Sequence, residues 1–273
     1  MANRYLTIGD STCDAMKNIV ITGASGGIGA ALALRATADG HRVALAARRE
    51  SELKEVAKRA GANALAVPAD VTRRADVERL RDAAIAKFGS VDVWINNAGR
   101  GITRTVIDLT DAEFDEMMAV NVKSALYGMQ AIVPHFIERG SGHLINVSSM
   151  LSRVPAATYR SAYNAAKAAL NALTANMRVD LSAQHPGIQV SLVIPGLVTT
   201  EFARHAVGGS PALPPAIARE AQTPEQVADK IAELIENPVA EIYTNPEHHD
   251  RALRYFQDVG AFEREVAAAF RRS

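Results

Sequence analysis

Residues 18–29 read NIVITGASGGIG, a short β-branched run that leads directly into a glycine-rich turn. A helical stretch, Gly27–Asp39, follows. Glycine supplies the free φ that a strand-to-helix turn needs, and its missing side chain lets a phosphate approach the backbone. The helix N-terminus adds free N–H groups and a positive dipole end. The stretch predicts a nucleotide site, with an ordinary tight turn as the alternative. It is not a P-loop, because no Gly-Lys-Ser/Thr follows.

The same alternation of short apolar runs and longer amphipathic stretches continues along the chain. Runs that are apolar on both faces are typical of a parallel sheet covered by helices. The predicted strands are Asn18–Thr22, Arg42–Ala47, Ala64–Pro68, Val91–Asn96, Leu144–Val147, Val190–Ile194 and Glu241–Thr244. The helices predicted between them are Gly27–Asp39, Ser51–Arg59, Arg74–Phe88, Asp111–Arg139, Tyr159–Gln184 and Pro224–Glu236. We therefore predict an α/β fold: a Rossmann-type, doubly wound parallel sheet of about seven strands flanked by helices, plus a C-terminal helical tail.

Composition excludes several classes of protein. The 273 residues are 48% hydrophobic and 22% charged, which is ordinary for a soluble globular protein. Lysine plus arginine and aspartate plus glutamate number 30 each, which argues against a nucleic-acid partner. The single cysteine, Cys13, excludes an internal disulfide. The chain shows no signal-peptide core and no run of about 18 apolar residues. We therefore predict a cytoplasmic protein with no membrane span.

We predict three parts of the chain. Residues 1–16 form a flexible leader, residues 17–246 the Rossmann domain, and residues 247–273 an amphipathic helical extension that Gly260 would divide. Within the domain, residues 201–222 are rich in glycine and proline and would form a lid over the substrate, with an ordinary surface connection as the alternative.

The end of the second predicted strand bears on the cofactor. An acidic residue there would bind a ribose 2′-hydroxyl, whereas an arginine accommodates a 2′-phosphate. The strand ends Ala46-Ala47-Arg48-Arg49, without an acid. This pattern favours NADP(H), with Arg48 at the phosphate, and leaves NAD(H) open; solvated helix-entry charges are the alternative reading.

Tyr163 and Lys167 are four residues apart in a predicted helix, which places them on one face about 5–6 Å apart at Cβ. A nearby ammonium would lower the pKa of the phenol by about one to three units, so that it exchanges protons with an alcohol or carbonyl oxygen. The preceding strand ends at Ser148 and Ser149, at the sheet edge where the glycine turn also lies. Ligands of parallel sheets bind at that edge.

Together these motifs resemble the short-chain dehydrogenase/reductase family in its single-domain form, from about Lys17 to Thr244. Thr22–Gly29 matches the family's glycine loop, Asn96–Gly99 its NNAG motif, and Pro195–Thr200 its nicotinamide-side loop. The resemblance implies a catalytic set of Asn121, Ser149, Tyr163 and Lys167. It implies cofactor contacts by Gly23, Ser25, Gly27, Ile28, Gly29, Arg48, Asp70, Val71, Asn97, Ala98, Gly99, Tyr163, Lys167, Pro195, Gly196, Val198 and Thr200. The pair His248–His249 looks like half a metal site, but no further ligands accompany it, so we predict no metal.

The resemblance also implies the role of each catalytic residue. Tyr163 would be the general acid in reduction and the general base in oxidation. Lys167 would bind the nicotinamide ribose and lower the tyrosine pKa, and Ser149 would donate to the substrate oxygen. Asn121 would hold a water that links Lys167 to solvent. Hydride would pass between the nicotinamide and a small carbonyl or secondary alcohol; the apolar lid hints at a lipophilic one.

The chain departs from the family pattern at three places. Gly26 stands where NADP-preferring members often carry a basic residue. The separation from Ser149 to Tyr163 is fourteen, so Ser148 remains a second candidate. The chain lacks the family's closing Asp-Gly-Gly turn, which bears on the expected homodimer or homotetramer. The alternative functions are a non-catalytic NADP(H)-binding sensor or scaffold and a sugar epimerase or dehydratase.

Overall fold

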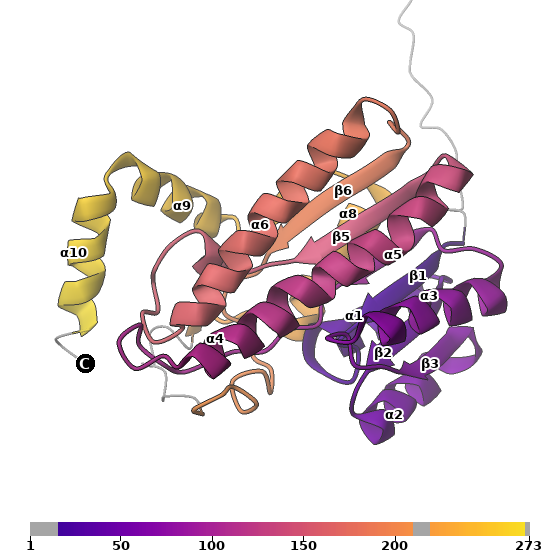
Figure 1. Ribbon diagram of the computed structural model, residues 1–273, viewed down its shortest axis with the longest axis horizontal. Coiled ribbons are helices and arrows are strands. Elements are labelled where there is room, and N and C mark those ends of the chain that lie inside the picture. The colour runs from indigo at the N-terminus through magenta and orange to yellow at the C-terminus, as the bar shows by residue number, and fades with distance from the viewer. Residues whose placement is uncertain (1–15, 210–218, 271–273) are drawn as a thin grey trace, which may run out of the picture.

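The computed structural model, which describes residues 16–209 and 219–270, is built around a parallel sheet (Figure 1). Its strands run in the order β3-β2-β1-β4-β5-β6-β7, and every neighbouring pair is parallel. The strands are β1 (Asn18–Thr22), β2 (Arg42–Ala47), β3 (Ala64–Pro68), β4 (Val93–Asn96), β5 (Gly142–Val147), β6 (Ile188–Ile194) and β7 (Glu241–Tyr243). The predicted doubly wound sheet is confirmed.

Helices cover both faces of the sheet. In the described residues they are α1 (Gly27–Ala38), α2 (Glu50–Ala60), α3 (Arg74–Phe88), α4 (Asp111–Met118), α5 (Ser124–Arg139), α6 (Ser161–Ser182), α8 (Pro224–Glu236), α9 (Glu247–Gln257) and α10 (Val259–Phe270). Helices α3, α5 and α6 pack on one face, and α1, α2 and α8 pack on the other. Helices α9 and α10, at the left of Figure 1, pack with residues of β6 and β7. Residues 1–15, 210–218 and 271–273, which include most of the predicted leader and part of the predicted lid, lie outside the description.

Local sequence explains where several helices begin and end. Thr110 caps α4 and Thr223 caps α8, each in a reciprocal capping box with the residue three positions on. Helix α3 ends at Gly89 and α5 at Gly140, both with positive φ (85° and 72°). Glycine tolerates that backbone geometry without strain, which makes it a common helix terminator.

The strand order places the site. The chain leaves β1 outward to β2 and β3, then crosses back to β4 on the other side of β1. The loops that follow β1 and β4 therefore leave the sheet side by side and in opposite directions. This reversal is the point at which parallel sheets of this kind bind ligands, outside the carboxyl ends of the strands.

Two helical details differ from the sequence-based expectation. The predicted helix Asp111–Arg139 contains a π-helical turn at Ala119–Lys123, a feature that often marks functional sites. The tail divides at Asp258, whereas Gly260 lies within α10. Asp258 breaks the helix because its carboxylate accepts the Ala261 N–H (2.8 Å) and so caps the next one.

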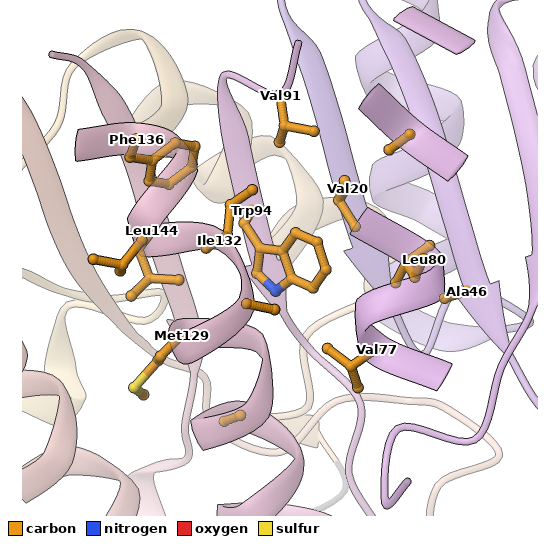
Figure 2. Close-up of a cluster of buried hydrophobic side chains, with 14 of the residues drawn as sticks. Val20, Ala46, Val77, Leu80, Val91, Trp94, Met129, Ile132, Phe136 and Leu144 are labelled. Carbon is orange, nitrogen blue, oxygen red and sulfur yellow. The ribbon is translucent and has the colours of Figure 1, made fainter. Parts of the chain in front are cut away.

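The core on the α3–α5–α6 face is centred on Trp94 of β4, the only tryptophan of the chain (Figure 2). Its side chain is fully buried, and the indole Nε1–H donates to Asn96 Oδ1 (2.8 Å). The amide of Asn96 donates in turn to Asn146 Oδ1 on β5 (2.8 Å) and to the Ala125 carbonyl (3.3 Å). A buried polar chain thus links the two central strands to α5, with every member satisfied.

Truncation of the indole tests this arrangement. We expect Trp94→Ala to lower the free energy of unfolding by about 3–5 kcal/mol, because it leaves a large cavity and removes the donor to Asn96. Urea unfolding followed by far-UV circular dichroism measures the change. Val179→Ala, at a position 70% exposed on α6, is the control and should stay within about 0.5 kcal/mol. A loss below about 1 kcal/mol for Trp94→Ala would contradict the central role of this residue.

Candidate active site

The glycine turn after β1 touches the turn after β4. The Asn97 amide donates to the Thr22 carbonyl (2.9 Å), and the Thr22 hydroxyl oxygen accepts the backbone N–H groups of Asn97 (3.0 Å) and Ala98 (3.1 Å). A Cβ on Gly23 would lie 2.8 Å from Ala98 Cα, and one on Gly29 would lie 2.5 Å from the Gly23 carbonyl oxygen. These positions accept only glycine because the two turns approach so closely.

The turn also has the form of a phosphate cradle. Helix α1 begins after Gly26 without a side-chain capping bond, so its first N–H groups have no side-chain acceptor there. Gly27 has a φ of 55°, and a Cβ added to it would lie 3.1 Å from Thr200 Cγ2. The Pro195–Thr200 segment therefore faces the turn across a narrow gap. Bare N–H groups, a helix dipole and missing side chains fit a dinucleotide pyrophosphate.

The arginine pair after β2 separates in space. Arg49 lies on the glycine turn, where its guanidinium donates to the Ser25 hydroxyl (3.1 and 3.3 Å), whereas Arg48 is exposed. Adjacent positions reveal nothing of side-chain direction, so sequence alone did not single out Arg49. After β3, Asp70 accepts the backbone N–H (3.0 Å) and the hydroxyl (2.8 Å) of Thr72. The next residue, Val71, is buried.

Tyr163 occupies the first turn of α6 and is only 8% exposed. Burial raises the pKa of its phenol, while a hydrogen bond with Ser149 and the charge of Arg160 act in the opposite direction. Ser148 faces elsewhere, since its hydroxyl donates to Asn171 Oδ1 (2.6 Å). Of the two candidate serines, Ser149 is therefore the one beside the tyrosine.

Lys167 lies one turn further along α6 and is buried. Its ammonium donates to the Val147 carbonyl (2.8 Å) and lies 5.8 Å from the centre of the Tyr163 ring. Burial lowers the pKa of Lys167 to about 8. Desolvation is the largest influence on the pKa of Tyr163 and raises it, and the lowering by Lys167 stays a prediction.

Asn121 lies in the π-helical turn and is 1% exposed. Its amide donates to the carbonyls of Arg100 (2.9 Å) and Met117 (3.1 Å), and its oxygen accepts the Arg100 N–H (3.2 Å). A Cβ on Gly99 would lie 2.9 Å from that oxygen and 3.5 Å from Lys167 Nζ. Asn121, the turn after β4 and Lys167 are therefore brought together as expected. The water that Asn121 would hold stays a prediction.

The Pro195–Thr200 segment is fixed from two sides. The Pro195 carbonyl accepts the Met150 N–H (2.7 Å), next to the serine turn. Gln222 donates its N–H to the Leu197 carbonyl (2.9 Å), and its carbonyl accepts the Thr199 N–H (2.9 Å). Ile28 of the glycine turn and Val198 of this segment are partly buried against the core below.

The described part of the predicted lid reaches the site. The Phe202 ring meets the Tyr163 ring edge-on, with centroids 5.5 Å apart. Further along, the Thr103 N–H donates to the Val207 carbonyl (2.7 Å), so the segment also pairs with the loop after β4. These contacts place the apolar Phe202 ring against Tyr163 and tie its segment to the loop after β4.

Two absences can be stated for the described residues, 16–209 and 219–270. They contain no group of three or more histidine, cysteine, aspartate or glutamate side chains arranged to hold a metal ion. No helix among them has the length and apolar character that crossing a bilayer requires. The adjacent pair His248–His249, considered in the sequence as half a metal site, lies at the start of α9.

Comparison with known proteins assigns the family. Residues 17–208 match the model of the short chain dehydrogenases, so the chain belongs to this family. An uncharacterised oxidoreductase of Staphylococcus epidermidis is 35% identical over 184 residues, which cover 67% of this chain and 79% of the relative.

Two solved structures are similar over most of the chain. A short chain dehydrogenase/reductase from Burkholderia phymatum in complex with NAD has a TM-score of 0.81 at 26% identity, covering 89% of this chain and 94% of that one. An alcohol dehydrogenase from the archaeon Thermococcus sibiricus, complexed with 5-hydroxy-NADP, has a TM-score of 0.72 at 29% identity, covering 84% and 95%.

The burial of the Lys167 ammonium predicts how its removal changes the free energy of unfolding. We expect Lys167→Met to raise the free energy of unfolding by about 2 kcal/mol at pH 7, because it removes a charge that folding desolvates. The native pKa of about 8 is below the ordinary 10.5, so the wild-type protein gains stability as pH rises through that window. The advantage of the variant should therefore shrink above pH 8.

Urea unfolding at pH 7 and at pH 9.5 measures both values. Lys54→Met is the control, because Lys54 is exposed on α2 beside Glu50. We expect it to change stability by less than about 0.5 kcal/mol at either pH. A Lys167→Met protein that is less stable than wild type at pH 7 would contradict the prediction.

Proposed function

We propose that this protein is an oxidoreductase that transfers hydride between a nicotinamide dinucleotide, NADP(H) in preference to NAD(H), and a small carbonyl or secondary-alcohol substrate. One observation carries the proposal: Ser149, Tyr163 and Lys167 lie together beside a glycine cradle that fits a pyrophosphate. The similar structures that hold NAD or 5-hydroxy-NADP support a nicotinamide cofactor. The domain limits, the cytoplasmic location and the homo-oligomeric state stay predictions.

The cofactor, when bound, supplies or accepts the hydride. The residues of the chain provide the proton and the hydrogen bonds around the reacting atoms. Tyr163 is protonated at neutral pH because burial raises its pKa, which suits a proton donor to a carbonyl oxygen during reduction. The Ser149 hydroxyl donates a hydrogen bond to the same oxygen. In oxidation, the deprotonated oxygen of Tyr163 accepts the alcohol proton.

The ammonium of Lys167 lies near the Tyr163 ring and is held by its hydrogen bond to the Val147 carbonyl. In this position it can hold the nicotinamide ribose hydroxyls and stabilise negative charge on the phenol. Phe202 meets the Tyr163 ring edge-on, and this apolar contact would help exclude water from the reacting atoms. On the adenosine side, Arg48 and Arg49 follow β2, the strand end at which a 2′-phosphate is expected, and the contact of Arg49 with Ser25 of the glycine turn supports this role.

Removal of the phenolic hydroxyl tests the proton-transfer step. We expect Tyr163→Phe to lower turnover about 10²–10⁴-fold on any active carbonyl or alcohol, because the proton donor is lost. Binding of NADPH and NADH, followed by cofactor fluorescence, should persist. Tyr127→Phe on α5, where the ring packs on Arg74 (4.5 Å), is the matched control and should retain turnover.

A panel of aliphatic, aromatic and steroid carbonyls and alcohols, with NADPH and NADH in parallel, supplies the substrates. Unchanged turnover in Tyr163→Phe with cofactor binding intact would favour the non-catalytic module. Product formation without net change in cofactor redox state would favour the epimerase or dehydratase. Equal rates across the panel would contradict the preference for lipophilic carbonyls.

Substitution of the arginine pair tests cofactor choice. We expect Arg48→Ala and Arg49→Ala each to weaken NADPH binding about 10-fold or more, because each removes a charged donor to the 2′-phosphate. NADH, which lacks that phosphate, should bind nearly as before. Fluorescence titration of both cofactors measures the two affinities. A wild-type preference for NADH would contradict the proposed role of Arg48.

A further inference from the structure

His248 lies in the first turn of α9, outside the residues 17–208 that match the family model. It is nevertheless 9% exposed and packs against the segment that follows β6. A Cβ added to Gly196 would lie 2.0 Å from His248 Cε1, 2.8 Å from Nδ1 and 3.1 Å from Nε2. Those three atoms are the nearest that such a Cβ would meet. The imidazole edge therefore occupies the space that a side chain at position 196 would need.

The backbone around His248 is tied to the same segment. The His248 N–H donates to the Asn245 carbonyl (3.1 Å), which closes the first turn. Just before it, the Thr244 hydroxyl donates to Gln222 Oε1 (2.6 Å), and the Gln222 amide returns a bond to the Thr244 carbonyl (3.1 Å). Gln222 is the residue that pairs with Leu197 on the other side. The start of α9 and the Pro195–Thr200 segment thus share one hydrogen-bonded support.

The imidazole contributes its shape and not a charge. Burial and the neighbouring Arg251 lower the pKa of His248, and the carboxylates of Glu220 and Glu247 oppose them weakly. The ring is therefore neutral at pH 7. Its Nδ1 is buried and has no hydrogen-bond partner within the described residues, so that nitrogen does not fix the ring by a polar contact. The ring lies where a Cβ at position 196 would be.

We propose that His248 is a positioning residue of the active site: its ring supports Gly196 and so sets the position of the Pro195–Thr200 segment. This inference rests on the proposed function, because the family resemblance makes Pro195–Thr200 the loop on the nicotinamide side of the cofactor. Helix α9 would then be part of the cofactor site, although it lies outside the family match. A ring that only filled the tail core would affect stability and leave cofactor binding unchanged.

Complementary substitutions at the two positions test the contact. We expect Gly196→Ala to weaken cofactor binding at least 10-fold, because the new methyl group meets the imidazole. The double variant Gly196→Ala/His248→Ala should recover most of that loss, since the methyl group then has room. His248→Ala alone should weaken binding about 3- to 10-fold. His248→Gln keeps a planar group there, so its cofactor affinity should lie between those of the wild type and His248→Ala.

Two controls separate positioning from stability. His249→Ala changes the adjacent, exposed ring of the same helix, which packs on Tyr243 (5.4 Å). Phe262→Ala removes a buried side chain of α10 from the tail core without touching Gly196. Neither control should change cofactor affinity more than 2-fold, although Phe262→Ala should lower the melting temperature. Fluorescence titration with NADPH and NADH and thermal unfolding are measured for every variant.

The outcomes distinguish this inference from the proposed function. Independent effects of the two substitutions in the double variant, or an equal loss of affinity in Phe262→Ala and His248→Ala, would overturn the role of His248. Wild-type protein that binds neither cofactor would overturn the proposed function and this inference with it. If Gly196→Ala does not fold, folding of the double variant is itself the expected rescue. If neither folds, the comparison of His248→Ala with Phe262→Ala decides.

Discussion

The close approach of two backbone turns, one after β1 and one after β4, is the constraint on which the rest of the site depends. Gly23 can meet Ala98 only because it has no side chain, and the Thr22 hydroxyl then binds the second turn in place. A series of direct contacts leads from there to the rest of the site. Gly99 lies against Asn121 and Lys167, and Lys167 reaches the end of β5, where the serine turn begins. Loss of the first contact would shift every later group.

Burial acts on the two ionisable groups of the site in the same sense. It raises the pKa of Tyr163 and lowers the pKa of Lys167, so that each moves toward its neutral form. The protein therefore holds a protonated phenol beside an ammonium that is close to losing its proton. Such a pair costs stability, since hydration lost on folding is only partly replaced by the Val147 carbonyl. Sites with shifted proton affinities are often those that transfer protons.

Periodicity and motif order predicted the sheet, its helices and the residues around the turns, because these depend on which residue types recur along the chain. Features set by tertiary packing were not predictable in this way. The direction of Arg49 toward Ser25, and the dominance of burial over charge at Tyr163, need the fold. The sequence also marked His248 only as half of a metal site, since nothing local shows that Gly196 lies against it.

The π-helical turn at Ala119–Lys123 has a consequence for how this region can change. A π turn contains one residue more than the α-helical turn it replaces, and one residue corresponds to about 100° of rotation. Helix α4, which contacts α6, and helix α5, which packs on β4 and β5, therefore present faces of different phase within one continuous rod. Deletion of a single residue there would restore a regular helix and rotate one half against its partner. The region should therefore be sensitive to any change in length.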